Sequence, residues 1–187
     1  MSEFFRYRKM GEMKGQICAT EKLLKEFRLT RTTAPLPEEG NPVGTWYADL
    51  FYYGGKKCVI LMHEASGYCV FGINMNREEI QDLPDLMRLD LLVLMKDDAF
   101  TVEQINQVQE SLKHTTVCRT NNRKMLGHIK QCLLDVTLRL DSGSLIPQPL
   151  AIAFEANHSM VGPYWDPTNA LRSVLNGEIP VSHRAKY

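Results

Sequence analysis

The sequence predicts an α+β domain in which an antiparallel sheet of three to four strands packs against several helices. Residues 45–53 and 56–63 have strand composition and are separated by Gly54-Gly55, a strong signal for a tight hairpin. Beyond residue 76, apolar residues recur at helical spacing. Strands in the first half and helices in the second favour α+β over an alternating βαβ array.

The hairpin also predicts a register. A two-residue turn places Tyr53 opposite Lys56 and Trp46 opposite His63. Because side chains alternate along a strand, two mostly apolar sets then lie on opposite faces of the sheet. One set is Trp46, Ala48, Leu50, Tyr52, Val59 and Leu61, and the other is Tyr47, Asp49, Phe51, Cys58, Ile60 and Met62. Such faces predict a sheet that is at least partly covered on both sides.

The remaining elements follow from capping and spacing. Asn76 with Glu79, and Thr101 with Gln104, have the capping-box spacing of a helix start. The longest expected helix has Met125, Ile129, Cys132, Leu133, Val136 and Leu140 on one face. Strands are expected over 15–19, 68–73 and 115–120, and helices over 21–28, 85–96, 102–113, 122–140 and 167–175, with a further helix from residue 76.

The domain organisation follows from length and local composition. With 187 residues the chain fits a single domain. Residues 1–14 are polar and predict a flexible N-terminal arm, whereas residues 15–187 predict the α+β domain. From about residue 142 the chain is rich in Pro, Gly and Asn, which predicts an irregular C-terminal extension up to the helix capped by Asp166.

Bulk composition argues against several classes of protein. Lys plus Arg (22) equals Asp plus Glu (22), and this zero net charge does not favour a nucleic-acid binder. No apolar run approaches the length of a membrane span, so no membrane association is expected. The five cysteines contain no C-x-x-C pair and mostly lie in apolar runs, as in a cytoplasmic protein with free core cysteines.

The segment 120–128 has the most unusual local chemistry. Asn121, Asn122, Arg123 and Lys124 stand at the start of the longest helix, where N–H groups and a partial positive charge already gather. Gly127 lies inside that helix, where a close packing partner or a ligand would justify its cost. The segment is either a capped and packed helix end or an anion-binding corner. Its polar stripe consists of Lys124, His128, Gln131 and Asp135.

A second candidate group surrounds the hairpin. Asp49 shares its predicted face with apolar residues, so its carboxylate needs a hydrogen-bonding or cationic partner, for which Arg123 is a candidate. His63, opposite Trp46, is either a structural histidine or a general base. No histidine lies at metal-ligand spacing, and no phosphate loop, nucleophile elbow or cofactor motif occurs, so neither a metal nor a cofactor is expected.

Four segments resemble a family of small bacterial domains of unknown function. Residues 18–24 (CATEKLL) are similar to C-T-x-K-L-L, residues 41–50 (NPVGTWYADL) to D-P-L-G-x-W-H-A-N-L, residues 57–61 (KCVIL) to part of R-K-C-V-L-F, and residues 120–127 (TNNRKMLG) to T-N-x-R-S-x-L-G. The resemblance spans residues 16–140, with a looser echo over 157–171. Tyr47 and Asp49 depart from the family pattern, which has His and Asn there. The resemblance implies a fold but no activity.

These observations favour a binding or protein-interaction module over an enzyme, in a bacterial, plasmid or phage setting. The expected partner is a protein or a small anionic ligand. The predicted site consists of Asn121, Asn122, Arg123, Lys124, His128, Trp46, Tyr47 and Asp49. The alternative is an enzyme acting on a nucleotide or nucleic acid, which requires Asp49, His63, Arg123 and His128 to converge in one cleft.

Overall fold

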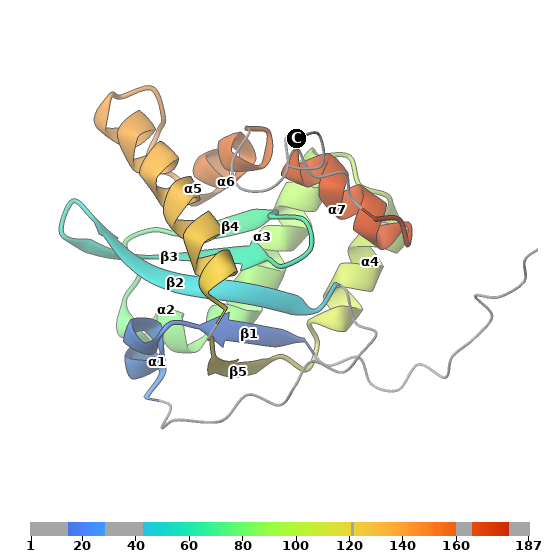
Figure 1. Cartoon of the computed structure of the whole chain (residues 1–187), viewed down its shortest axis with the longest axis horizontal. Coiled ribbons are helices and arrows are strands. Elements are labelled where there is room, and N and C mark those ends of the chain that lie inside the picture. The colour runs from blue at the N-terminus through green and yellow to red at the C-terminus, as the bar shows by residue number, and fades with distance from the viewer. Residues whose placement is uncertain (1–14, 29–42, 121, 160–165, 180–187) are drawn as a thin grey trace, which may run out of the picture.

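The sheet of the computed structural model has five strands in the order β4-β3-β2-β1-β5 (Figure 1). The structure describes residues 15–28, 43–120, 122–159 and 166–179, so the predicted arm at residues 1–14 lies outside it. The strands are β1 (Gln16–Ala19), β2 (Thr45–Tyr53), β3 (Lys56–His63), β4 (Cys69–Gly72) and β5 (Thr116–Arg119). β2, β3 and β4 are antiparallel, whereas β1 runs parallel to both β2 and β5.

The prediction of an antiparallel sheet with three to four strands is correct for β2, β3 and β4 and for the α+β class, but wrong in the number of strands and in the direction of the two pairings of β1. The two additional pairings involve β1 and β5, which have four residues each. Parallel neighbours need long crossover connections, and here β1 and β5 are separated by about a hundred residues of chain. Residue patterns within a short strand do not encode the direction of such a distant partner.

The hairpin has the predicted register. Trp46 pairs with His63 and Tyr53 pairs with Lys56. Gly54 and Gly55 occupy the turn with φ values of 56° and 77°, a left-handed conformation that both turn residues of a type I′ hairpin require. The alternation inferred from the sequence therefore places Tyr47 and Asp49 on one face and Trp46 on the other.

Seven helices occur in the described part of the chain, with boundaries close to the predicted ones apart from α6. They are α1 (Glu21–Phe27), α2 (Arg77–Gln81), α3 (Leu83–Asp97), α4 (Val102–Ser111), α5 (Arg123–Asp141), α6 (Pro149–Asn157) and α7 (Pro167–Leu175). The capping boxes predicted at Asn76 and Thr101 are both formed. In Figure 1, α5 crosses in front of β2 and β3, and α3 lies behind the sheet.

The two helices cover the two faces of the sheet and form the main core. α5 buries Met125, Ile129, Cys132, Val136 and Leu140, in agreement with the predicted apolar stripe. α3 buries Leu83, Met87, Leu91, Leu94 and Met95. Fully buried strand residues such as Trp46, Ile60 and Leu61 complete this core.

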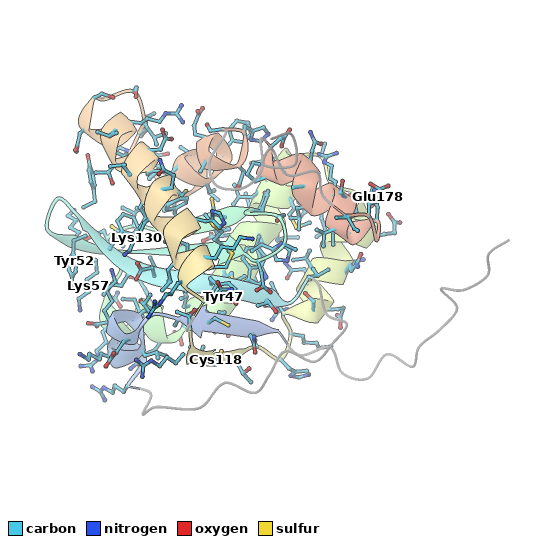
Figure 2. The ribbon with its side chains drawn as sticks, viewed as in Figure 1. Tyr47, Tyr52, Lys57, Cys118, Lys130 and Glu178 are labelled. Carbon is cyan, nitrogen blue, oxygen red and sulfur yellow. The ribbon has the colours of Figure 1, made fainter. Side chains whose placement is uncertain are left out.

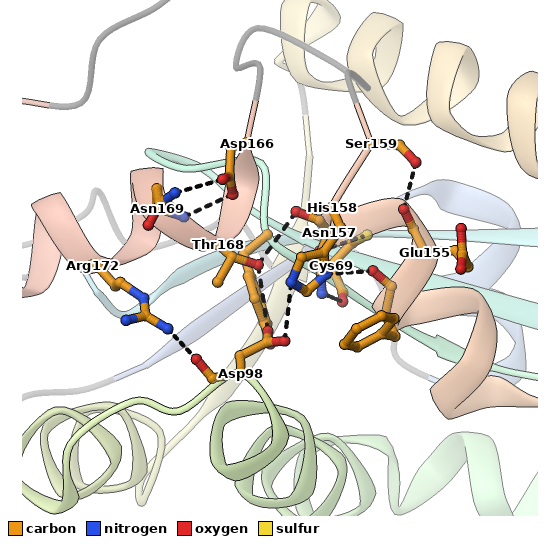
Figure 3. Close-up of polar contacts among 12 residues, drawn as sticks. Cys69, Asp98, Glu155, Asn157, His158, Ser159, Asp166, Thr168, Asn169 and Arg172 are labelled. Carbon is orange, nitrogen blue, oxygen red and sulfur yellow. Dashed lines mark hydrogen bonds and ion pairs between the residues drawn. The ribbon is translucent and has the colours of Figure 1, made fainter.

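Helix α6 corrects the prediction of an irregular extension from residue 142. Pro149 opens the helix at its first turn, a favoured position for proline. The sequence of α6 is apolar on almost every side, so it lacks the polar face from which a helical period is recognised. Asn157 at its end pairs with the edge of β4, because its Oδ1 accepts from Cys69 N at 2.7 Å and its Nδ2 donates to Cys69 O at 2.9 Å (Figure 3).

A buried carboxylate joins the C-terminal helices to the rest of the core. The Asp98 side chain follows α3 and is fully buried, and its Oδ2 accepts hydrogen bonds from the Tyr68 hydroxyl at 2.7 Å and from the Thr168 hydroxyl at 3.4 Å. His158 Nε2 lies 3.5 Å from Asp98 Oδ1, and the Arg172 guanidinium donates to the Asp98 carbonyl (Figure 3). Residues from α6 and α7 are therefore integral to the domain.

Candidate functional site at the ends of two parallel strands

The carboxyl ends of β1 and β5 lie side by side, and each strand is followed by a helix. Thr120 N donates to Ala19 O at 2.9 Å, and Thr20 N donates to Ala48 O at 3.0 Å. α1 begins at Glu21 and α5 begins at Arg123, so the first turns of both helices lie at the carboxyl ends of these two strands, which we call this edge of the sheet. We call this region the strand-end junction, defined by Thr20, Lys22, Asp49, Asn122 and Arg123.

Tyr47 is the centre of a hydrogen-bonded chain next to this junction. Its hydroxyl donates to Glu64 Oε1 at 3.0 Å and accepts from Asn122 Nδ2 at 3.2 Å. Burial is the main reason that the pKa of Tyr47 is raised, so the hydroxyl keeps the proton that it donates to Glu64. Tyr47 is marked in Figure 2 where α5 crosses β2.

Asn122 is the residue that caps α5. Its Oδ1 accepts from Met125 N at 3.1 Å, and its own N–H donates to Thr120 Oγ1 at 3.2 Å. This cap satisfies one of the N–H groups left open at a helix start. Both ends of the Asn122 amide are therefore engaged inside the protein. Asn121, the other predicted amide, lies outside the described residues.

Two cysteines lie beside Tyr47 in the same row across the sheet. Cys18 is the register partner of Tyr47 on one side and of Cys118 on the other. The two sulfur atoms are 3.5 Å apart, and both residues are buried. We refer to Cys18, Tyr47, Glu64, Cys118 and Asn122 as the Tyr47 cluster.

Asp49 has a partner, but it is not the predicted one. Its carboxylate accepts from the Thr20 hydroxyl at 2.7 Å and pairs with Lys22 Nζ at 3.1 Å. Both partners come from the segment that follows β1. Arg123 was the expected partner, yet Arg123 and Lys124 are exposed and have no ion-pair partner among the described residues. The first turn of α5 contains no acidic residue either.

The other predicted site residues do not join this group. Trp46 is fully buried, donates from Nε1 to Val43 O at 3.2 Å, and packs its ring against His63 with centroids 5.0 Å apart. Both lie on the face opposite Asp49 and Tyr47, so Trp46 does not line the site. His63 is the last residue of β3, and its Nδ1 lies 2.8 Å from the hydroxyl of Ser66 in the turn that follows.

The alternative enzyme constellation is therefore not formed. Asp49 and His63 lie on opposite faces of the sheet, because the hairpin register pairs His63 with Trp46. His128 is buried, so the stripe from Lys124 to Asp135 is not a continuous solvated face. Gly127 is exposed, and a Cβ added there would meet nothing within 4 Å, so close packing does not explain this glycine.

The predicted site did not include five residues of this region: Cys18, Thr20, Lys22, Glu64 and Cys118. The first three lie within the family-like segment 18–24, so that motif was the available signal. Cys118 carries no local signal, because only the parallel pairing of β1 with β5 brings it to Cys18. In the described ranges, no group of three or more His, Cys, Asp or Glu residues could hold a metal ion.

Comparison with known proteins assigns a family. A family model described as a domain of unknown function, DUF6933, matches residues 16–169. The chain belongs to this family. The DUF6933 match begins at β1, contains the whole Tyr47 cluster and ends within α7, so it covers the resemblance inferred for residues 16–140 and most of the looser echo over 157–171. No curated protein and no solved structure matches the chain. Within the part of the chain that the structure describes, no helix is long and apolar enough to cross a membrane.

Proposed function

We propose that this DUF6933 chain is a binding module that holds a carboxylate or phosphate group at the strand-end junction. The observation that carries the proposal is the common origin of α1 and α5 at one edge of the sheet. The 19-residue helix α5 brings its first N–H groups and a partial positive charge to that edge, next to the start of α1, which has seven residues and Glu21 in its first turn. In open sheets with parallel strands, ligands bind outside the carboxyl ends of the strands.

The side chains at this edge supply further positive charge. Arg123 and Lys124 are exposed in the first turn of α5, where no acidic side chain offsets them. The planar Arg123 guanidinium can bind a carboxylate or a phosphate through two parallel hydrogen bonds. Lys22 is 52% exposed but shares its charge with Asp49, so Arg123 and Lys124 are the principal anion-binding residues.

The Tyr47 cluster gives this site a fixed frame. Asn122 is held by Tyr47 and by the backbone of α5, so the first turn that carries Arg123 has a defined orientation. A preorganised site loses less conformational entropy when a ligand binds. The natural partner is a small anion or an acidic segment of another protein.

The test is a thermal-shift titration with inorganic phosphate and, separately, with a glutamate-rich peptide, at constant ionic strength set with chloride. The variants are Arg123→Ala with Lys124→Ala, and, as a matched control, Lys130→Ala, an exposed lysine further along α5 that Figure 2 marks. Either probe is expected to raise the melting temperature of the wild type and of Lys130→Ala but not of the double variant. Equal shifts in all three proteins, or no shift in any, contradict the proposal.

A further inference from the structure

The two thiols of the Tyr47 cluster form a closely spaced pair that anion binding does not use. Cys18 and Cys118 are register partners on adjacent parallel strands, and their sulfur atoms are 3.5 Å apart. Neighbouring strands lie about 4.8 Å apart. That spacing falls within the range of roughly 4.4–6.8 Å between Cα atoms that a disulfide bridges. Bond formation then requires rotation of the side chains and little movement of the strands.

We propose that Cys18 and Cys118 are a redox-active pair that a small peroxide converts into a disulfide. The inference does not depend on the proposed anion binding. All five cysteines are free thiols in the structure, and the proposed disulfide joins only these two. Disulfides of this kind inside reducing compartments are transient and serve redox sensing.

The surroundings divide the two thiols into different roles. The interaction with Cys18 lowers the pKa of Cys118, and the interaction with Cys118, together with burial, raises the pKa of Cys18. The thiolate is the reactive form of cysteine. Cys118 is therefore the attacking sulfur, and Cys18 keeps its proton and resolves the intermediate.

The chemistry balances with hydrogen peroxide as the oxidant. The Cys118 thiolate attacks one peroxide oxygen, the O–O bond breaks, and a sulfenic acid and hydroxide form. The hydroxide takes up the proton that Cys118 released on ionisation. The Cys18 sulfur then attacks the sulfenic sulfur, and the S–OH oxygen leaves as water with the Cys18 proton. Each sulfur loses one electron in total, and the two peroxide oxygens are reduced to two waters.

Burial restricts which oxidants can act. Cys18 is 5% exposed and Cys118 is 2% exposed, so only a small oxidant reaches them in the folded protein. A bulky disulfide such as oxidised glutathione needs direct access to the attacking sulfur and is expected to react much more slowly than peroxide. This contrast distinguishes a reaction of the native pair from a reaction of unfolded chains.

The experiment maps disulfides in the full-length protein. The native protein is treated with hydrogen peroxide, remaining thiols are alkylated under denaturing conditions, and the chain is digested with trypsin without reduction. Cys18 then lies in peptide 15–22, Cys118 in 114–119, Cys58 and Cys69 together in 58–77, and Cys132 in 131–139. The expected product joins 15–22 to 114–119, and dithiothreitol reverses it.

Variants and a stability measurement complete the test. Cys118→Ser is expected to abolish the product, whereas Cys58→Ser, a buried cysteine outside the pair, keeps it. Because the bond closes a loop of about a hundred residues, the oxidised protein is expected to unfold at a higher urea concentration. If Cys118→Ser fails to fold, the wild-type peptide map still shows whether peroxide joins Cys18 to Cys118. Cys69 and Cys132 also interact, so peptides 58–77 and 131–139 could be linked instead. Five alkylated cysteines after peroxide treatment, a link only between those two peptides, or irreversible oxidation of Cys118 without a link each overturn the inference.

Discussion

Asn122 donates a hydrogen bond from its Nδ2 atom to the Tyr47 hydroxyl at 3.2 Å while its Oδ1 caps α5. One amide therefore fixes both the start of the longest helix and its position over β2. The Tyr47 hydroxyl in turn donates a hydrogen bond to Glu64, the residue that follows β3. Three segments that are distant in sequence are thereby joined by two side-chain hydrogen bonds.

Replacing Asn122 with alanine is expected to cost more than an ordinary helix cap. Loss of a cap costs about 1 kcal/mol, and loss of the bond to Tyr47 adds about 0.5–1 kcal/mol. The free energy of unfolding should be measured by urea denaturation for Asn122→Ala, Tyr47→Phe and the double variant. The matched control is Asp166→Ala, which removes the side-chain cap of α7. Strictly additive effects of the two substitutions would show that the Asn122–Tyr47 bond carries no energy.

Replacing Gly127 with alanine is expected to stabilise the protein by about 0.5–1 kcal/mol. Alanine is the better helix former, and its Cβ would have open space around it at this position. Gly54→Ala provides the control, because open space surrounds that position too but its φ of +56° strains any residue with a Cβ. Thermal unfolding of both variants separates the two cases. A destabilised Gly127→Ala would contradict this account.

The pH dependence of stability should change when Asp90 is replaced with asparagine. Asp90 lines a hollow of about 160 Å³ beside β4 and α3, together with the acidic Glu79. Burial raises the pKa of Asp90 above its ordinary value of 3.8. Above pH 3.8 the unfolded chain ionises first, so the native state binds more protons and stability falls as pH rises through the native pKa.

Asp90→Asn removes this loss. The difference in unfolding free energy between Asp90→Asn and the wild type should therefore grow in favour of the variant as pH rises above about 4, and become constant above the native pKa of Asp90. Urea denaturation at a series of pH values measures it. Asp85→Asn, an exposed position in the first turn of the same helix, serves as the control. A constant difference across the series would refute the assignment to Asp90.

Asn157→Ala is expected to destabilise the protein by on the order of 3 kcal/mol. The substitution leaves the N–H and C=O of Cys69 without their partner at the edge of β4, and unpaired buried backbone groups are expensive. Hydrogen exchange at the Cys69 amide and denaturant unfolding are the measurements. Asn106→Ala changes an exposed asparagine of α4 and should have an effect below about 0.5 kcal/mol. Equal effects of the two variants would show that Asn157 is dispensable.

The local elements were predictable because their signals are local. Gly54-Gly55 determined the hairpin and its register, and the spacing of Asn76 to Glu79 and of Thr101 to Gln104 located two helix starts. The apolar stripe of α5 was visible for the same reason. Helix α6 was missed because it is apolar on nearly all sides and packs within the domain, so no polar face marks its period.

The candidate site was only partly predictable. Tyr47, Asp49, Asn122, Arg123 and Lys124 came from sequence motifs, and the structure places Tyr47 against Asn122. Arg123 was predicted as the partner of Asp49, and this prediction was wrong. Lys22 pairs with Asp49 because β1 lies next to β2, and no sequence spacing reveals that pairing. Trp46 and His63 could have been excluded, since the predicted register already placed them on the face opposite Asp49.

The sequence alone determined the α+β class, the hairpin with its two faces, and most helices, because these depend on turn chemistry, caps and periodicity over a few residues. Only the tertiary structure decided that β1 lies parallel between β2 and β5. That arrangement depends on contacts between residues 29 positions apart for β1 with β2 and 100 positions apart for β1 with β5, whose pairing no local pattern encodes. It brings the starts of α1 and α5 to one edge of the sheet and the sulfur atoms of Cys18 and Cys118 within 3.5 Å of each other.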